Sequence, residues 1–229
     1  MNYIIKQRGF SDSCKEGLRC VIHKAGKKSR TENYRGITIL SVFAKIFEMA
    51  VHNRLAFVSE AFGKVDEFNG GSLKGCRTSD NMFILNGLIH RQLLIGKPLY
   101  VCYIDFSKAF DVVNRHVLFY KLMKSGWHGR IIDTMRSLYK KTYFRVKHNG
   151  QISAPVLDSI GVNQGGNASG FMFRRYMADL CEYLTTEFGV CTEEMILLHL
   201  LWADDLILVS DTIEGLQAQL DGLLIFLRR

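Results

Sequence analysis

Hydrophobic positions along this chain gather into short unbroken runs that end abruptly at acidic residues. One run covers Met195–Trp202, another covers Leu206–Val209, and the pair Asp204–Asp205 lies between them. Apolar runs of this length, bounded by polar residues, are typical of buried β-strands. A third run, Leu99–Ile104, is rich in β-branched and aromatic residues and ends at Asp105. The pattern predicts a hairpin tipped by two acids, beside a strand that ends in a third.

Other segments repeat their hydrophobic residues at the 3.6-residue spacing of amphipathic helices. The first expected helix follows Ser41, a favourable N-cap, and has Phe43, Phe47, Val51 and Leu55 among its apolar positions. Further helical stripes lie within residues 83–89, 117–122, 131–139, 171–188 and 216–227. Residues 143–148 alternate with period two and lead into Asn149-Gly150, which predicts a β-hairpin. Residues 1–20 show no clear period, so we expect an irregular segment there.

The three aspartates would form a cation site if the strands bring them together. Asp105 would then lie with Asp204 and Asp205 at one edge of a sheet. Neighbouring ionised carboxylates repel each other and lose solvation at an apolar tip. A divalent cation relieves both problems, and an oxygen-rich site suits Mg²⁺. Three such acids are also the ligand set of a two-metal phosphoryl-transfer site. The competing interpretation is an Asp-Asp turn in solvent, which is the commoner case for an isolated dipeptide.

Composition narrows the class of protein. The 229 residues are 48% hydrophobic, enough for one large domain or two subdomains. A net charge of +8, from 30 basic and 22 acidic residues, favours a polyanionic partner. The six cysteines form no Cys-x-x-Cys pair, which argues against a zinc site. There is no signal peptide and no apolar run of membrane-spanning length, so we expect a reducing, intracellular compartment and no membrane.

Two motifs carry a resemblance to a known family. Residues 103–111 read Tyr-Ile-Asp-Phe-Ser-Lys-Ala-Phe-Asp and residues 202–205 read Trp-Ala-Asp-Asp, with their first aspartates 99 residues apart. Together they resemble the A and C motifs of reverse transcriptases, in the form found in non-LTR (LINE-type) retrotransposons and their group II intron relatives. The resemblance covers about residues 20–229. It implies an α+β fold, the fingers and palm of a right-hand polymerase, with a mostly antiparallel palm sheet backed by helices and with the thumb absent.

The resemblance also implies a metal centre. Asp105, Asp204 and Asp205 would be the catalytic acids. They would hold two Mg²⁺ ions, with Mn²⁺ as a substitute, together with the backbone carbonyl of Phe106. Asp111, six residues beyond the first acid, is expected to be a structural or capping residue and not a metal ligand.

Other positions match the family's substrate-binding residues. Four are expected to bind the nucleotide: Lys24, Arg35, Phe110 and Gln164. The two cations would contact the triphosphate, the phenylalanine would exclude a ribose 2′-hydroxyl, and the glutamine would shape the pocket. On spacing alone, a core aromatic is the commoner interpretation of that phenylalanine. Lys74 and Arg77 fall in a loose match to an element that contacts nucleic acid, where backbone contacts tolerate shifted cations.

The expected domains are an irregular segment 1–20, a fingers-like segment 21–98 and a palm 99–229, with a fingers-side hairpin near 143–162. The implied reaction is synthesis of DNA on an RNA template from a DNA primer and deoxynucleoside triphosphates. The implied location is the nucleus or cytoplasm, within a retroelement ribonucleoprotein. The alternatives are a catalytically inactive remnant that binds RNA or a protein partner, a group II intron-type enzyme, and an RNA-directed RNA polymerase.

Overall fold

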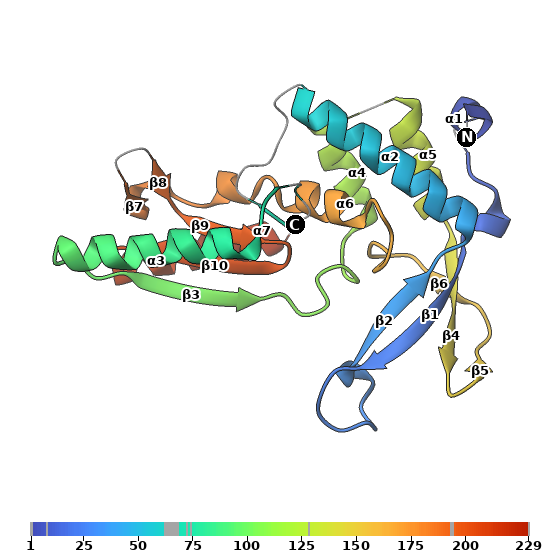
Figure 1. Ribbon diagram of the computed structural model, residues 1–229, viewed down its shortest axis with the longest axis horizontal. Helices are drawn as coiled ribbons and strands as arrows, with labels where there is room; N and C mark the ends of the chain where they lie inside the picture. The colour runs from blue at the N-terminus through green and yellow to red at the C-terminus, as the bar shows by residue number, and fades with distance from the viewer. Residues whose placement is uncertain are drawn as a thin grey trace. The chain divides into compact units, whose positions relative to one another are not determined.

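The computed structural model describes residues 2–7, 9–61, 69–71, 73, 75–127, 129–192 and 195–228 (Figure 1). The chain forms two compact units, each built from two separate segments. The first unit comprises Met1–Lys64 and Lys108–Tyr176, and the second comprises Val65–Ser107 and Met177–Arg229. Helices and sheets are mixed in both units, which is the α+β class that the sequence predicts. The boundaries proposed for fingers and palm stay a prediction.

A five-stranded sheet organises the first unit. Its strands are β1 (Glu16–His23), β2 (Tyr34–Ile39), β4 (Thr142–His148), β5 (Gln151–Ile152) and β6 (Val156–Asp158). β1 pairs antiparallel with β2 and parallel with β4, and both β5 and β6 pair antiparallel with β4. The turn from β4 to β5 is Asn149-Gly150, with φ of 47° and 78°. Positive φ at both positions confirms the hairpin expected there.

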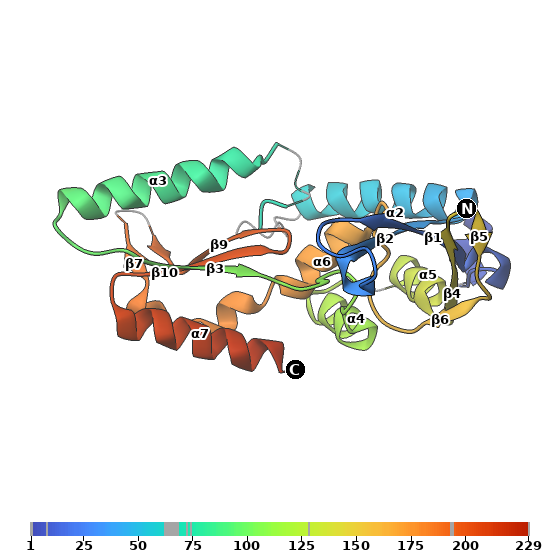
Figure 2. The ribbon, with the colours of Figure 1, turned by 90° about the horizontal axis from the view of Figure 1, so that it is seen from below.

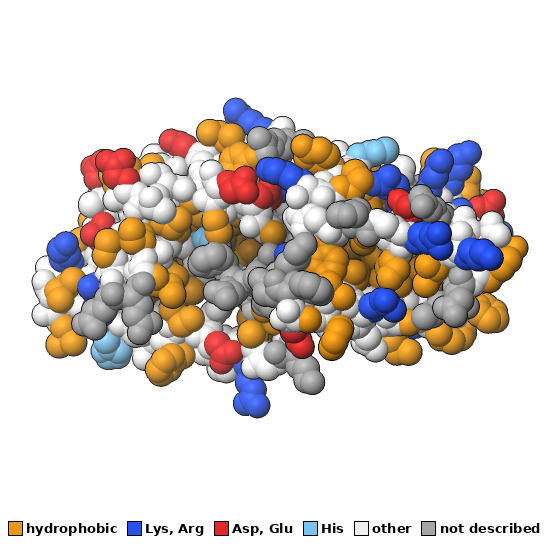
Figure 3. Space-filling view, turned by 90° about the horizontal axis from the view of Figure 1, so that it is seen from above, with side chains coloured by type: hydrophobic (Ala, Val, Ile, Leu, Met, Phe, Trp, Pro, Cys, Tyr) orange, Lys and Arg blue, Asp and Glu red, His pale blue; other side chains and the backbone are white. Residues whose placement is uncertain are grey.

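The longest helix of the first unit buries only part of its wide apolar stripe. The helices of this unit are α1 (Asn2–Gln7), α2 (Val42–Ala61), α4 (Arg115–Lys124), α5 (Arg130–Tyr139) and α6 (Ser169–Met177). Ser41 caps α2 as expected, since its Oγ accepts a hydrogen bond from the Ala44 N–H at 3.2 Å. Phe47 and Val51 are buried, but Phe43 is 72% exposed. One layer of neighbours cannot cover so wide an apolar stripe, and Figure 3 shows hydrophobic side chains at the surface on one face of the molecule.

Arg115 ties the segments of the first unit together from the start of α4. Its guanidinium donates to the carbonyl oxygens of Tyr139, Asp158, Ile160 and Gly161, and to the Thr142 hydroxyl, over 2.5 to 3.0 Å. It also forms an ion pair of 2.7 Å with the Asp158 carboxylate. The side chain is only 8% exposed. One buried cation therefore satisfies the backbone of several loops at once.

A three-stranded antiparallel sheet organises the second unit. Its order is β3 (Tyr100–Asp105), β10 (Asp205–Ser210) and β9 (His199–Trp202). Helices α3 (Thr78–Leu94) and α7 (Ile213–Leu227) lie on opposite faces of this sheet (Figure 2). A small hairpin, β7 (Val190–Cys191) and β8 (Ile196–Leu197), adds to the core formed by Leu88, Leu200 and Val209. β9 and most of β10 are buried, which explains their continuous apolar runs, whereas β3 is only partly buried and its Tyr103 is 70% exposed.

Two segments differ from the sequence predictions. Residues 2–20 are not irregular, because α1, the 3₁₀ turn η1 (Asp12–Cys14) and the start of β1 lie there. Most positions of β1 are only partly buried, which hides the alternation of a strand. The helix expected over 171–188 ends with α6, and the 3₁₀ turns η3 (Leu180–Tyr183) and η4 (Thr186–Phe188) follow. Such turns also repeat side chains every three residues, so the apolar stripe continues beyond the helix.

Within the described ranges, every helix is too short or too polar to cross a lipid bilayer.

Candidate active site

Three acidic residues lie at one end of the sheet in the second unit. β3 ends at Asp105 and β10 begins at Asp205, and the antiparallel pairing places these two residues directly opposite each other. Asp204 precedes Asp205 in the tight turn from β9, where Ala203 has φ of 54°. The prediction that acids meet there is confirmed for Asp105 and Asp205, whereas no third acidic side chain completes a cluster among the described residues. Their assignment as metal ligands stays a prediction.

The chemistry of this edge suits a cation. The Cβ atoms of directly opposed residues lie about 4.5–5.5 Å apart in an antiparallel pair, so Asp105 and Asp205 repel each other when both are ionised. Both are exposed, and Asp204 is partly buried. Hard divalent cations prefer such carboxylate oxygens. As placed, the described residues include no group of three acidic, histidine or cysteine side chains that could hold an ion. The acidic oxygens therefore suit a divalent cation chemically, and the strand register brings Asp105 and Asp205 together. Asp204 does not complete a group of three ligands among the described residues.

A short segment, residues 69–71, holds the turn before Asp204 in place. The sequence analysis did not link this segment to the acids. Asn69 is 3% exposed, and its Oδ1 accepts hydrogen bonds of 3.0 Å from the N–H groups of Gly71 and Ala203. A Cβ added to Gly71 would lie 2.3 Å from the Ala203 nitrogen. Only glycine allows this close approach of two backbones. The run Asn69-Gly70-Gly71 is the feature of the sequence that could have indicated this support for the turn before Asp204.

Asp111 organises a second group of predicted residues, all in the first unit. Gln164 donates from Nε2 to Asp111 Oδ2 at 3.2 Å, and its backbone carbonyl accepts from the Thr38 N–H at 3.0 Å. Burial raises the pKa of the Asp111 carboxyl above its usual value, and nearby basic residues, Arg35 among them, oppose this shift. Asp111 therefore fixes the Gln164 side chain and attracts Arg35, in keeping with the structural role expected for it.

Phe110 presents one ring face to the interior of the first unit. Its ring stacks on Phe173, with 4.6 Å between centroids and 20° between planes. Its carbonyl accepts from the Val162 N–H at 2.8 Å, so the chain is fixed on both sides of the ring. Phe110 is half-buried, whereas Phe173 is buried. The Phe110 ring is therefore only partly enclosed by the core. Its role in excluding a ribose 2′-hydroxyl stays a prediction.

Glu48 is a buried acid beneath the loop that carries Gln164. Its side chain is fully enclosed, Oε1 accepts a hydrogen bond of 3.3 Å from the Tyr139 hydroxyl, and Oε2 has no partner among the described residues. Burial raises its pKa to about 7, although the N–H groups of Ala168 and Asn167 favour the charged form. Sequence reasoning missed this residue. The available signal was a glutamate on the buried stripe of α2, one position after Phe47.

The other predicted cations have less specific surroundings. Lys24 follows β1, its backbone N–H donates to the Asn33 carbonyl at 2.8 Å, and its side chain is exposed. Arg77 is exposed at the start of α3, with its N–H donating to the Asp80 carboxylate at 2.7 Å. Lys74 lies outside the described residues. Arg35 acts electrostatically on Asp111, the hydrogen-bond partner of Gln164. The binding roles of all these cations stay predictions.

Comparison with protein families gives one match over most of the chain. The model described as "Reverse transcriptase (RNA-dependent DNA polymerase)" matches residues 22–229. The 149 kDa protein of transposon TX1 from Xenopus laevis is 26% identical over 208 residues, which are 90% of this chain and 16% of that protein. The Pol polyprotein of the type-2 retrotransposable element R2DM from Drosophila melanogaster is 26% identical over 227 residues, 99% of this chain and 21% of that protein. The chain therefore spans about a fifth of these relatives.

Solved structures with a similar fold include telomerases. An apo telomerase from Candida tropicalis, truncated from its C-terminal domain, has a TM-score of 0.64 and 17% identity, over 97% of this chain and 50% of that chain. The telomerase of the same organism in complex with a fragment of telomeric RNA has a TM-score of 0.67 and 15% identity, over 97% of this chain and 40% of that chain. At this level of identity the likeness shows the fold.

Proposed function

Because the chain belongs to the reverse transcriptase (RNA-dependent DNA polymerase) family, we propose that it synthesises DNA on an RNA template as part of a non-LTR retrotransposon polyprotein. The observation that carries the proposal is the register of the second sheet, which sets Asp105 opposite Asp205 at the strand ends. Core packing does not require acids there, whereas nucleotidyl transfer does. The retrotransposon proteins among the relatives support the same conclusion.

Reverse transcriptase domains generally use divalent metal ions. In this chain we assign two Mg²⁺ ions to Asp105, Asp204 and Asp205, with the Phe106 carbonyl as a further ligand. When bound, such ions lower the pKa of a primer 3′-hydroxyl and stabilise charge on the leaving pyrophosphate. The acids supply the negative oxygens, and Asn69 holds the turn that carries two of them.

Four residues are assigned to the proposed nucleotide contacts. Lys24 and Arg35 bind the triphosphate through their charges. Asp111 keeps Gln164 in one position, since the hydrogen bond between them fixes the amide. Phe110 excludes a ribose 2′-oxygen by its bulk. The RNA template, DNA primer and deoxynucleoside triphosphates belong to this proposal as its partners and substrates.

The test is single-nucleotide addition under single-turnover conditions, with enzyme in excess over a primer annealed to RNA or to DNA. Asp105→Asn and Asp205→Asn are expected to abolish incorporation while the far-UV spectrum stays native. Asp221→Asn, which removes an exposed carboxylate on α7 of the same unit, is the matched control and should keep full activity. Undiminished incorporation by either site variant would overturn the metal assignment.

A further inference from the structure

A groove lies between the helices α4 and α5 and the strand β6. Its volume is about 560 Å³, within the range of small-ligand pockets. The lining residues all fall between Arg115 and Ser159, so the groove belongs entirely to the first unit. Residues three or four apart on a helix share one face, and α4 lines the groove in this way with His116, Phe119, Tyr120 and Met123.

Two buried rings form the floor of this groove. Phe119 and Tyr139 have ring centroids 6.5 Å apart, and both side chains are buried. The Tyr139 hydroxyl donates to Glu48 Oε1 at 3.3 Å, which fixes this ring. The Phe119 ring lies 5.5 Å from the Arg136 guanidinium. Because the floor is already ordered, a ligand that packs on it binds with little reorganisation of the protein.

Exposed apolar side chains form the walls. Tyr120 and Met123 of α4 are 62% and 44% exposed, and Leu157 of β6 is 54% exposed. Aromatic residues and methionine are enriched at protein–protein interfaces, and the flexible thioether of methionine adapts to the shape of a partner. The walls and floor together therefore suit large apolar side chains from another protein.

Positive charge lies at the rim. Arg136 and Lys140 line the groove, and in the described part of the chain neither of them forms an ion pair. Two other lining cations already act on acids, because Arg115 pairs with Asp158 at 2.7 Å and Lys141 acts on the acid that begins η1. The described lining includes no aspartate or glutamate. Arg136 and Lys140 are therefore the cations that can receive carboxylates from a ligand.

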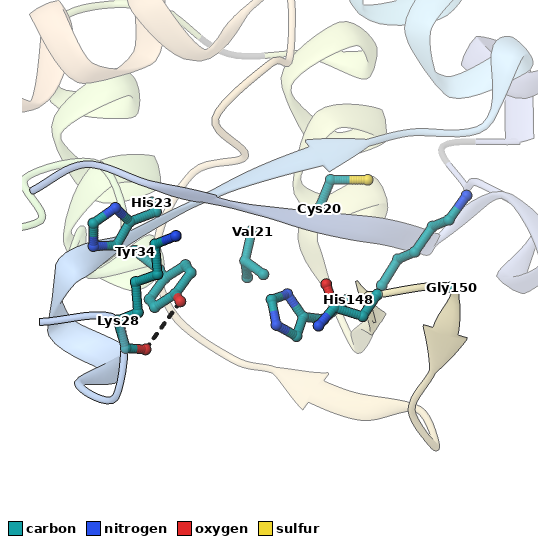
Figure 4. Close-up of a pocket in the computed structure, with 9 residues that line it drawn as sticks. Cys20, Val21, His23, Lys28, Tyr34, His148 and Gly150 are labelled. Carbon is teal, nitrogen blue, oxygen red and sulfur yellow. Dashed lines mark hydrogen bonds between the residues drawn. The ribbon is translucent and has the colours of Figure 1, made fainter.

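Another hollow of the first unit differs from the groove in its lining. It measures about 680 Å³ and is also basic, with Lys28 beside the rings of His23, Tyr34 and His148 (Figure 4). These rings have polar edges, and the Tyr34 hydroxyl already donates to the Lys28 carbonyl at 2.9 Å. Its described lining holds no leucine or methionine. The groove beside α4 therefore combines positive charge with exposed aliphatic and thioether surface, which this hollow does not.

We propose that the groove docks a short acidic segment of a partner protein. One or two large apolar side chains of that segment pack on the rings, and flanking carboxylates pair with Arg136 and Lys140. Charge complementarity supports this occupant, because the chain carries a net charge of +8 and attracts acidic partners. A strand of nucleic acid would satisfy the cations but has no aliphatic group to cover Met123 and Leu157. This inference goes beyond the proposed reaction and does not depend on the catalytic acids.

The experiment measures binding of fluorescein-labelled peptides to the whole chain by fluorescence anisotropy. The main probe is a twelve-residue peptide with one tryptophan and one leucine, four positions apart, among six acidic residues. One control peptide replaces the tryptophan and leucine by serine, and the other replaces the acids by their amides. The main probe should bind about tenfold or more tightly than either control, because both the apolar and the charged contacts contribute. Equal affinity of the main probe and either control would overturn the proposal.

The position of the bound peptide is mapped on the native chain. A copy of the main probe carries benzoylphenylalanine in place of tryptophan, and irradiation links it to its neighbours. Mass spectrometry should locate the links on peptides from α4, α5 or β6. Links confined to other parts of the chain would refute the groove as the docking site.

Substitutions at the rim test the charges. Arg136→Gln combined with Lys140→Gln should weaken binding of the main probe about tenfold, the value of 1.4 kcal/mol. The matched control combines Lys27→Gln with Lys28→Gln, two exposed lysines of the loop before β2, and should change affinity less than twofold. Equal losses in the two double variants would show that only net charge matters and would reject the assignment.

Substitutions in the walls test the apolar contacts. Tyr120→Ser combined with Met123→Ser should weaken binding about tenfold or more. The control combines Val42→Ser with Phe43→Ser, two exposed apolar residues of α2 in the same unit, and should bind within twofold of the native chain. Circular dichroism checks the fold of each variant, and if a wall variant fails to fold, the cross-link map decides the question.

Nucleic acid is the competing ligand class, and a ten-nucleotide oligouridylate represents it. This strand should not displace the main probe from the groove, and the rim variant should change its affinity less than twofold. Displacement of the probe, with equal losses for strand and peptide in the rim variant, would assign the groove to nucleic acid and overturn the proposal. Asp205→Asn should leave peptide binding unchanged, so a failure of the proposed polymerase reaction and a failure of this inference give different results.

Discussion

Replacing Glu48 with glutamine should change how the stability of the first unit depends on pH. Glu48 is fully enclosed, with one oxygen held by Tyr139 and the other without a partner among the described residues. Such an environment favours the neutral acid, because burial penalises the charged form. The pKa is accordingly raised to about 7. Glutamine keeps the shape of the neutral acid and cannot ionise.

The magnitude follows from linkage. The unfolded chain releases this proton near 4.5 and the folded chain holds it until about 7. Below pH 4.5 both states are protonated, so the stabilisation is fully present. As pH rises toward 7 it is lost at about 1.4 kcal/mol per pH unit. The loss amounts to about 3 kcal/mol and is complete above the folded pKa. Glu48→Gln should therefore gain stability relative to the native chain between pH 5 and 8, by up to that amount.

The assay is urea unfolding of both proteins at pH 5, 6, 7 and 8, with the difference in unfolding free energy plotted against pH. Other titrating groups, including the buried His199 whose pKa burial lowers to about 4, are common to both proteins and cancel. Glu60→Gln, an exposed acid on the same helix, is the control and should give a flat difference. A flat difference for Glu48→Gln, or a Glu48 carboxyl that titrates near 4.5 by NMR, would refute the reasoning.

Three further predictions concern single residues. Phe110→Val should raise ribonucleotide over deoxyribonucleotide incorporation about tenfold or more, measured as the ratio of kcat/KM values, and an unchanged ratio in an active variant rejects the gate. Gly71→Ala should destabilise the second unit by about 1–3 kcal/mol, because its Cβ would meet the Ala203 backbone at 2.3 Å. Gly87→Ala meets nothing within 4 Å and should not lower Tm. Arg115→Met should lower the unfolding free energy by about 3–5 kcal/mol in urea titrations, because several buried carbonyls lose their donor and the Asp158 carboxylate keeps only Arg19, at 3.5 Å. A loss below 1 kcal/mol would contradict that role.

The sequence was most informative where a buried strand meets an acid. The apolar runs located β3, β9 and β10, and their polar ends located Asp105, Asp204 and Asp205. Local signals also sufficed for the Asn149-Gly150 turn and the Ser41 cap. Each of these features depends on a few residues that are neighbours in the sequence, so a local pattern is enough to predict it.

Features that depend on distant partners were not predictable in the same way. No local signal shows that β1 pairs in parallel with β4, more than 100 residues later. Glu48 reads as an ordinary surface acid of a helix until Tyr139 and the loop before α6 enclose it. Asn69 acquires its role only through the Ala203 backbone. Each of these is a contact between residues far apart in the sequence. The spacing of hydrophobic residues within one helix or strand does not reveal it.

The division of the chain into interleaved segments has a consequence for its synthesis. The chain passes from one unit to the other after Lys64, again after Ser107 and again after Tyr176. β3 leaves the ribosome well before β10, its pairing partner, because 99 residues separate the two strands. At translation rates of about 5–20 residues per second, that delay is roughly 5–20 s. During this interval the apolar edge of β3 is open to wrong partners. We therefore expect the strand that carries the first aspartate to stay open to other chains until β10 emerges.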